Sequence, residues 1–352
     1  MRIALDCRYI GKSGIGTYIE NIVDELCKNH PEHDYLLIVE QGKDLKCFKN
    51  NVSVLYTSIQ PFSLRELFTF PTREINQCDV YFSPYINIPG GIKIPTYSTI
   101  HDVIFLDLPN LTSGIGKIIR KWFIQRAINK SKSIFTVSEF SKKRIRFHYK
   151  TSKNIVVTFS AISTSLKKYS KDNVSSSSKG SYLVYVGNIK AHKGLKVLLE
   201  AFTKTLSRGY EKMLYIVGDA EKMRSSDRQI SHYIDDSNRI KFTGFIPNEK
   251  MYNLICGADA LVLPTFYEGF GLTPLEALYL GTDVIISDIE VLKEVYGKLP
   301  VTFFKTGDAD DLASKIEKSH NKIEDVEHLR NRIDDLYNFR NIAETIIKEI
   351  EK

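Results

Sequence analysis

Short apolar segments alternate with segments of helical spacing along almost the whole chain. In the first half, the spacing predicts helices at 15–29, 63–76, 114–131 and 139–149. The apolar segments around them predict strands at 2–10, 34–41, 53–58, 79–84, 96–103, 133–138 and 155–161. A second series predicts strands at 182–188, 213–219, 240–245, 260–265, 283–288 and 301–306. Continuous apolar strands that alternate with helices are typical of parallel sheets covered on both faces.

A polar, serine-rich stretch separates the two series. Residues 165–180 show no regular spacing and have the composition of a linker. Two doubly wound α/β domains are therefore expected, at 1–170 and 171–335. Helix-spaced apolar residues predict a final helix at 336–352, which could pack on either domain and is placed back on the first. Ligands of such sheets bind beyond the carboxyl ends of the strands, so the loops there are the expected sites.

Composition and charge narrow the class of protein. The chain has 352 residues, enough for two domains with cores of their own, and a formal net charge of +7 that favours an anionic partner. Its five cysteines are scattered without a C-x-x-C pair, which fits a reducing compartment and argues against a disulfide framework or a zinc site. Early charges argue against a signal peptide, and no apolar run approaches the ~20 residues that cross a bilayer. A cytoplasmic location is expected.

The stretch at 264–288 places two carboxylates around a glycine-rich turn. Glu268 lies in a loop after a predicted strand, and Glu276 lies one turn inside the next helix. The N-terminus of that helix is suited to a phosphate, and Gly269 and Gly271 allow a ligand close to the backbone. Two hydroxyl-bearing groups with phosphate between them describe a nucleotide-sugar. On spacing alone, a helix N-terminus with two solvated glutamates is the better explanation, since two glutamates at this spacing often occur by chance.

This stretch resembles the donor-site signature of the retaining glycosyltransferases with the GT-B fold, glycosyltransferase family 4. Further segments resemble that family in the same order, namely 14–19, 99–109, 136–145, 185–202, 214–219 and 242–265. The resemblance implies two Rossmann-like domains facing across a cleft, with the acceptor bound by the first and the donor by the second. The "GNIKAHKG" segment is most similar to bacterial polysaccharide and O-antigen mannosyltransferases, which implies GDP-mannose as donor.

The resemblance also implies roles for residues of the second domain. Glu276 would bind the ribose, Glu268 would lie against the donor sugar, and Lys193 would neutralise the diphosphate. The backbone between these glutamates would contact sugar hydroxyls and phosphate, at Gly269, Phe270, Gly271 and Leu272. The family usually has an arginine where this chain has Asn188, so either Lys190 or backbone donors must replace that cation.

In the first half, the resemblance points to two loops. Gly14 and Gly16 follow the first strand and match a loop that faces the donor phosphates, although a tight turn without a ligand explains them equally well. His101 ends a predicted strand and matches a histidine near the reacting sugar. Asp102 could orient that imidazole or cap the next turn.

Competing motifs have weaker support. The "DADD" run at 308–311 satisfies a D-x-D metal pattern, but it precedes a helix and is better explained by N-capping. The chain lacks a G-x-x-x-x-G-K-[ST] phosphate loop and a G-x-G-x-x-G segment after a strand, so NAD chemistry has little support. No metal ion or other cofactor is expected.

The expected activity is that of a retaining, metal-independent hexosyltransferase of bacterial surface polysaccharide synthesis, such as O-antigen or capsule. His101, Glu268 and Lys193 would carry the catalysis, and the leaving phosphate would accept the proton of a glycan acceptor, lipid-linked on this view. UDP-sugars and dTDP-sugars remain open as alternative donors to GDP-mannose. So do a sugar-nucleotide 2-epimerase, a phosphorylase and a non-enzymatic sensor of nucleotide-sugars.

The segment at 116–133 is basic and aromatic. As a helix it would bury one apolar stripe and expose its cations. One interpretation is a solvated basic face. The other is peripheral attachment to an anionic membrane, on the inner face of the cell membrane. No nucleic-acid-binding module accompanies it, so nucleic acid is not expected as a partner.

Overall fold

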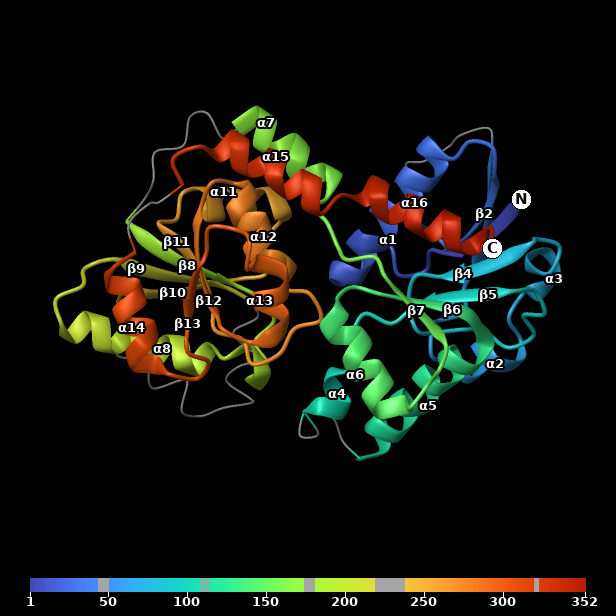
Figure 1. Ribbon diagram of the computed structural model, residues 1–352, viewed down its shortest axis with the longest axis horizontal. Helices are drawn as coiled ribbons and strands as arrows, with labels where there is room; N and C mark the ends of the chain where they lie inside the picture. Colours follow the sequence, from blue (N-terminus) through green and yellow to red (C-terminus); the bar gives the residue numbers. More distant parts are fainter. Residues whose placement is uncertain (44–50, 109–110, 112–113, 174–180, 219–237, 320–322) are drawn as a thin grey trace. The chain divides into compact units, whose positions relative to one another are not determined.

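The computed structural model describes the chain except for residues 44–50, 109–110, 112–113, 174–180, 219–237 and 320–322. It divides into two compact units (Figure 1). Unit 1 comprises Met1–Ser163 together with Tyr337–Lys352, and unit 2 comprises Thr164–Leu336. Within the described ranges, no helix is long and apolar enough to cross a membrane.

The described part of unit 1 contains a parallel seven-stranded sheet in the order β3-β2-β1-β4-β5-β6-β7. The strand order reverses between β1 and β4, so their carboxyl ends flank a topological switch point. All seven strands lie where the apolar segments predicted them. They are β1 (Arg2–Asp6), β2 (Asp34–Glu40), β3 (Val52–Thr57), β4 (Val80–Ser83), β5 (Thr96–Thr99), β6 (Ser131–Thr136) and β7 (Asn154–Val157).

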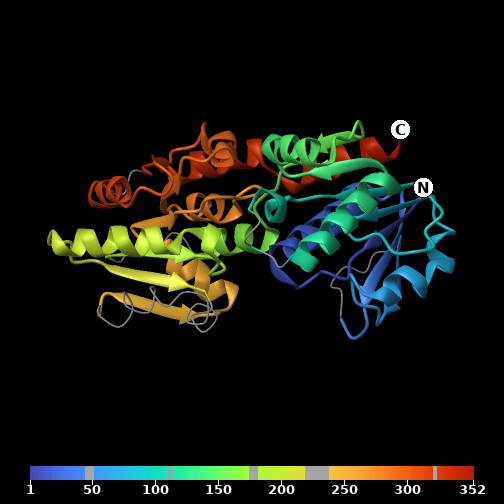
Figure 2. The same cartoon turned by 90° about the horizontal axis from the view of Figure 1, so that it is seen from below.

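Helices cover both faces of this sheet. Figure 1 shows α1 and α16 on one face and α5 and α6 on the other, and Figure 2 views the molecule from the side of α5. The predicted helix at 63–76 is divided at Pro71, since proline cannot donate a backbone hydrogen bond in a helix. The helices are α1 (Ser13–Asn29), α2 (Leu64–Phe68), α3 (Thr72–Ile75), α4 (Ile104–Asp107), α5 (Gly114–Lys130), α6 (Glu139–Tyr149) and α16 (Phe339–Ile350).

The last helix, α16, belongs to unit 1. It packs on α1, and its Glu349 carboxylate accepts hydrogen bonds from Ser133 Oγ (2.6 Å) and Asn154 Nδ2 (2.7 Å). The hydroxyl of Tyr97 donates to the carbonyl of Ile350. Contacts to three strands of the sheet therefore fix the end of the chain on this unit.

The described part of unit 2 contains a parallel six-stranded sheet in the order β10-β9-β8-β11-β12-β13. Its order reverses between β8 and β11, which defines a second switch point. The strands are β8 (Tyr182–Val186), β9 (Met213–Val217), β10 (Ile240–Gly244), β11 (Ala260–Leu263), β12 (Asp283–Ser287) and β13 (Thr302–Phe304). Doubly wound α/β architecture is thus confirmed in both units.

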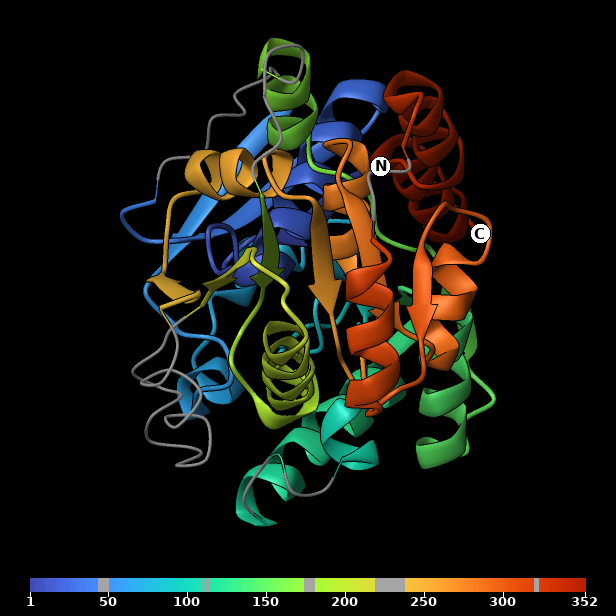
Figure 3. The same ribbon diagram turned by 90° about the vertical axis from the view of Figure 1, so that its left-hand side faces the viewer.

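The helices of unit 2 also form two layers. Figures 1 and 3 show α8 and α14 on one face of the sheet and α11 and α12 on the other. Leucine, isoleucine and phenylalanine side chains of α8 and α14 form a buried core with the strands. The helices are α7 (Thr164–Asn173), η3 (Ala191–Lys193), α8 (Leu195–Ser207), α11 (Asn248–Cys256), α12 (Leu272–Tyr279), α13 (Glu290–Tyr296), α14 (Ala309–Glu317) and α15 (Val326–Leu336).

The linker expected at 165–180 is wrong for its first part, which forms α7. Leu166 and Tyr169 are buried, and the Tyr169 hydroxyl donates to Asn253 of α11. Lys167 forms an ion pair with Asp334 of α15. These contacts place α7 in unit 2, so the units divide at 163/164 rather than at 170/171. The serine-rich residues 174–180 lie outside the described residues.

Candidate functional site

The predicted donor residues lie at the carboxyl ends of β8 and β11, on the two sides of the switch point of unit 2. The loop after β8 carries Lys193 in η3, and the loop after β11 carries Glu268. Because both strands are parallel neighbours, the loops that follow them meet at one edge of the sheet. This is the edge at which doubly wound sheets bind ligands.

The two loops are fixed to one another through their backbones. Gly194 adopts a left-handed conformation (φ +68°), and a Cβ at this position would lie 1.8 Å from the carbonyl oxygen of Pro264. The His192 carbonyl accepts hydrogen bonds from the backbone N–H of Phe266 (2.7 Å) and from Thr265 Oγ1 (3.1 Å). Only glycine fits between the loops here, so the lysine beside it has a defined position.

Lys193 and Glu268 form an ion pair. Lys193 Nζ lies 2.6 Å from Glu268 Oε1, and both side chains are mostly buried, with exposed fractions of 21% and 12%. The two residues were predicted for different parts of the ligand, the diphosphate and the sugar. The structure brings them into direct contact, so each holds the other in place while no ligand competes.

Helix α12 begins at the end of the glutamate-containing loop without a side-chain cap. Gly271 precedes it in a left-handed conformation (φ +84°), where a Cβ would lie 2.7 Å from Leu292 Cδ2. The Tyr296 hydroxyl donates to the Gly271 carbonyl. Leu272 starts the helix, and the ring of Phe270 is buried in the core, so Phe270 can offer a ligand only its backbone. The first turn carries no acidic residue that would oppose an anion.

Glu276 is the unpaired carboxylate of the site. It lies one turn inside α12, is partly buried, and makes no side-chain hydrogen bond or ion pair with the residues that the structure describes. Burial raises the pKa of Glu276 from 4.5 to about 7, because no cation offsets the loss of hydration. A group that donates hydrogen bonds to this carboxylate would relieve that cost.

The β8–α8 loop also contains a residue that sequence analysis did not single out. His192 is 9% exposed, and its Nδ1 is buried without a hydrogen-bond partner among the described residues. Burial, and then the charges of Lys193 and Lys190, lower the pKa of His192 to about 4, so the ring is neutral at pH 7. Its position directly before Lys193 in the sequence is the feature that could have identified His192 as a site residue. Asn188 and Lys190 are exposed on the same loop.

The glycines predicted in unit 1 differ in their surroundings. Gly16 lies in the first turn of α1, where a Cβ would meet the Tyr9 carbonyl oxygen at 2.4 Å. Gly14 is exposed, and a Cβ there would have no other atom of the described chain within 4 Å. Gly16 is therefore required for close packing of the preceding turn, whereas Gly14 leaves open space at the helix N-terminus.

His101 follows β5 and is held by its ring. His101 Nε2 lies 3.1 Å from the carbonyl oxygen of Pro84, and the ring packs edge-on against Tyr18 with centroids 5.0 Å apart. Burial lowers the pKa of His101 to about 4. A carbonyl only accepts, so the neutral ring carries its proton on Nε2 and presents Nδ1 as an acceptor. Asp102 Oδ1 accepts from Ile104 N, which favours the capping role of that carboxylate.

The "DADD" run caps a helix, as predicted. Asp308 Oδ1 accepts hydrogen bonds from the backbone N–H groups of Asp310 (3.1 Å) and Asp311 (3.0 Å) at the start of α14. Asp310 also forms an ion pair with Lys204 of α8. In the described part of the chain, no three histidine, cysteine, aspartate or glutamate side chains gather as a metal site.

Helix α5 differs from the expected basic helix with one buried stripe. Its second half buries Phe123, Ile124, Ala127 and Ile128. Its first half exposes a second apolar stripe, the α5 stripe, with exposed fractions of 75, 70, 50 and 48% for Ile115, Ile118, Ile119 and Trp122. The exposed cations Arg120 and Lys121 lie beside it. On the neighbouring helix α2, Leu64 and Phe68 are also exposed.

Comparison with known proteins supports the predicted class. Residues 167–335, which contain the whole candidate donor site, match the family model of glycosyl transferases group 1. O-antigen chain mannosyltransferase B of Escherichia coli is 25% identical over 228 residues, which cover 62% of this chain and 59% of that protein. O-antigen chain mannosyltransferase RfbU of Salmonella typhimurium is 28% identical over 198 residues, or 56% and 53% of the two chains. The chain thus aligns with little more than half the length of these relatives.

Solved structures extend the likeness to the whole chain. Sucrose-phosphate synthase from Thermosynechococcus elongatus is similar with a TM-score of 0.74 and 16% identity, covering 100% of this chain and 98% of the other. Anabaena HepE in complex with UDP and glucose is similar with a TM-score of 0.68 and 15% identity, covering 100% and 99%. At such identities the likeness shows the fold, and it confirms the predicted GT-B class with two Rossmann-like domains.

Proposed function

We propose that this chain is a glycosyltransferase that moves a sugar from a nucleotide-sugar to a glycan. One observation carries the proposal: a cation on one loop, the uncapped N-terminus of α12 after the adjoining loop, and an unpaired carboxylate one turn inside α12 lie at the switch point of unit 2. These are the groups that a diphosphate and a ribose require. The match of the same residues to glycosyl transferases group 1 supports it.

In this proposal the donor is bound by three contacts. Glu276 accepts hydrogen bonds from the ribose hydroxyls, while Lys193 and the N-terminus of α12 stabilise the diphosphate. The backbone of Gly269, Phe270 and Gly271 contacts the sugar and the phosphate. Since Lys193 is already paired with Glu268, an incoming diphosphate competes for the lysine and frees the glutamate to accept from sugar hydroxyls. The pair thus keeps both side chains ordered before the donor arrives.

Transfer needs charge stabilisation on the departing diphosphate. Lys193 and the helix dipole supply it from a preorganised position, so we propose that no metal ion is needed. Retention of the anomeric configuration follows if the acceptor hydroxyl attacks on the leaving-group face and gives its proton to the phosphate. His101 then accepts a hydrogen bond from a hydroxyl of the sugar through Nδ1, since its Nε2–H is held by Pro84.

The proposed donor is GDP-mannose and the acceptor a lipid-linked glycan of a bacterial surface polysaccharide. The named relatives are O-antigen mannosyltransferases, which supports this choice over other sugars. A UDP- or dTDP-sugar is the alternative donor, and a 2-epimerase is the alternative enzyme. The epimerase would turn over its sugar nucleotide without an acceptor.

We further propose that α2 and α5 attach the enzyme to the membrane that carries this acceptor. The α5 stripe has the spacing i, i+3, i+4, i+7 of a helix face, but it points to solvent rather than to the core. Exposed apolar residues flanked by Arg120 and Lys121 fit an anionic lipid surface.

Nucleotide binding and transfer test the proposal together. Purified protein is screened with GDP, UDP, dTDP and ADP for an increase in melting temperature, which a bound ligand produces by mass action. The purified protein is then incubated with radiolabelled GDP-mannose and a lipid-linked glycan fraction. The Glu276→Gln variant, expected to bind nucleotide poorly, replaces it in the control. The proposal predicts that one nucleotide stabilises the protein and that label enters the lipid fraction. Failure of all four nucleotides to raise the melting temperature would reject it.

A further inference from the structure

The switch point of unit 1 is lined by aromatic side chains that the proposed donor site does not use. Tyr9 follows β1 and Tyr85 follows β4, the two strands between which the sheet order reverses. Their ring centroids lie 4.8 Å apart in an edge-to-face arrangement. Tyr85 also contacts the ring of His101, which follows β5, with centroids 6.2 Å apart. The aromatic pair therefore occupies the edge where a doubly wound sheet takes its ligand.

A third ring, that of Phe62, completes this group from the loop between β3 and α2. Its centroid lies 6.3 Å from Tyr9, 5.6 Å from Tyr85 and 4.8 Å from Phe123 of α5. The backbone of Phe62 is left-handed, with φ +64°, which is unfavourable for a bulky residue. Such a conformation persists only where surrounding contacts hold it.

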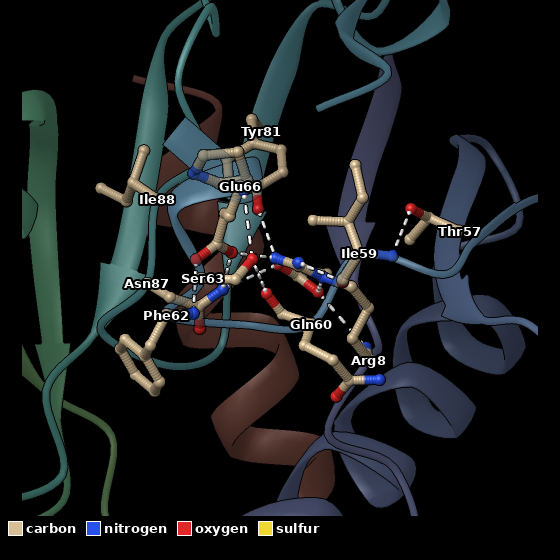
Figure 4. A network of polar contacts seen from close by, with 12 residues as sticks. Arg8, Thr57, Ile59, Gln60, Phe62, Ser63, Glu66, Tyr81, Asn87 and Ile88 are labelled. Atoms are coloured by element: carbon tan, nitrogen blue, oxygen red, sulfur yellow. Dashed lines mark hydrogen bonds and ion pairs between the residues drawn. The ribbon is translucent and has the colours of Figure 1, made fainter. Parts of the chain in front are cut away.

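Buried charged residues provide those contacts (Figure 4). Arg8 Nη1 donates to the Ile59 carbonyl (3.1 Å), and Glu66 Oε2 accepts from the backbone N–H of Phe62 (2.7 Å). The Arg8 guanidinium also pairs with Glu66 (2.5 Å) and with Asp6 (2.6 Å), and all three side chains are at most 3% exposed.

The amide of Asn87 joins the two carboxylates of this network. Asn87 Nδ2 donates to Asp6 Oδ2 (3.1 Å) and to Glu66 Oε1 (2.9 Å), and the Tyr81 hydroxyl donates to Asp6 as well. Buried ion pairs add little net stability, because desolvation offsets their attraction. What this network does achieve is a fixed position for the loop at 59–63, and with it for the Phe62 ring.

We propose that Tyr9, Phe62 and Tyr85 form a platform that binds a pyranose ring of the glycan acceptor. The inference rests on the proposed glycosyltransferase function and assigns its acceptor subsite. All three side chains are partly exposed, and the hydroxyls of Tyr9 and Tyr85 make no hydrogen bond with a described residue. A pyranose offers an apolar C–H face to aromatic rings and hydroxyls to the tyrosine O–H groups. A polyprenyl chain would gain nothing from those two hydroxyls.

Saturation-transfer NMR with methyl α-D-mannopyranoside and methyl α-D-galactopyranoside tests the platform without knowledge of the full acceptor. We expect transfer to at least one glycoside, reduced at least fivefold in Tyr85→Ala and clearly weakened in Tyr9→Phe, which removes only a hydroxyl. Tyr56→Ala is the matched control, because Tyr56 is exposed on β3 and belongs to no aromatic pair described above. Since Tyr9→Phe preserves the ring, it keeps the test valid if Tyr85→Ala does not fold.

Two outcomes would overturn the proposal. One is a signal unchanged in Tyr85→Ala and Tyr9→Phe but lost in Glu268→Ala, which would place the glycoside at the donor site. The other is the absence of a saturation-transfer signal for both glycosides. A signal for farnesol, used as a probe for a polyprenyl chain, together with no signal for the glycosides would have the same consequence. Nucleotide stabilisation, measured on the same Tyr85→Ala sample, reports on the donor site alone. We expect Tyr85→Ala to keep its stabilisation by nucleotide and to lose the glycoside signal. If nucleotide fails to stabilise the native protein, the proposed function itself would be rejected.

Discussion

Replacing Glu276 by glutamine should stabilise the unliganded protein while weakening nucleotide binding. The carboxyl has a pKa of about 7 in the folded protein and 4.5 as the ordinary value, because burial is not offset by a cation. The folded state therefore holds more protons than the unfolded state between these values, and stability falls as the pH rises through that window. Above pH 7 the full penalty is present, and below about pH 4.5 it vanishes.

The size of the effect follows from the shift. At roughly 1.4 kcal/mol per pKa unit, the difference between 4.5 and about 7 corresponds to about 3 kcal/mol. Glu276 is partly exposed, so solvent screening reduces this to about 1–2 kcal/mol. Glutamine carries no charge and escapes the penalty. Glu276→Gln should thus melt about 2–8 °C above the native protein at pH 8 and show no advantage near pH 4.5.

The binding assay should give the opposite sign. In the proposed complex, an ionised Glu276 accepts stronger hydrogen bonds from the ribose hydroxyls than a protonated one. Nucleotide affinity should therefore rise between pH 6 and pH 8, and binding should release protons, detectable by calorimetry in buffers of different ionisation enthalpy. Glu276→Gln should lose about 1–3 kcal/mol of nucleotide affinity. Glu268→Gln is the matched control, because Glu268 is paired with Lys193 and its neutralisation should give no gain in stability at pH 8. Stabilisation of Glu276→Gln that is the same at every pH, or a loss of stability at pH 8, would refute the reasoning.

Three further predictions concern the need for a metal ion, the binding of the α5 stripe to lipid, and the role of His101. If Lys193 and α12 supply the positive charge as proposed, transfer should persist in EDTA; complete loss that manganese restores would contradict this assignment. Trp122 is the sole tryptophan, so its fluorescence should shift to shorter wavelength with anionic vesicles at low salt but not with neutral ones. Lys121→Glu should weaken that shift, and an emission maximum indifferent to anionic lipid would leave α5 a solvated helix. His101→Ala should lower kcat by roughly 2–10-fold, the cost of one neutral hydrogen bond to the sugar, with nucleotide affinity unchanged. A lowered melting temperature with near-normal kcat would make that histidine structural.

The sheets were predictable because their strands are continuous apolar segments, a pattern that depends on no distant partner. Helix α7 was not, because its polar and serine residues match a linker, and its contacts through Leu166, Tyr169 and Lys167 depend on the fold of unit 2. The capping role of Asp308 is local and was predicted correctly. Contacts between residues far apart in the sequence leave no comparable local pattern from which they could be predicted.

The ion pair within the candidate donor site illustrates this limit. Lys193 and Glu268 are 75 residues apart, and their contact depends on the adjacency of β8 and β11. The unpaired state of Glu276 depends on everything packed around it. Likewise, Arg8 and Glu66 meet across 58 residues inside unit 1, where sequence analysis placed no buried charge. The residue types in the sequence identified the loops of interest. The contacts between residues of different loops could be seen only in the folded structure.

The return of α16 to unit 1 affects how the protein is made. The chain leaves unit 1 after Ser163 and re-enters it at Tyr337, so unit 2 is an uninterrupted segment and unit 1 is not. During synthesis, the surface of α1 that receives α16 stays uncovered until unit 2 has left the ribosome. Unit 2 can therefore complete its fold before the unit that precedes it, which reverses the usual N-terminal-first order. A released chain truncated before Tyr337 would keep the whole of unit 2 beside a unit 1 whose α1 surface, normally covered by α16, is exposed to chaperones.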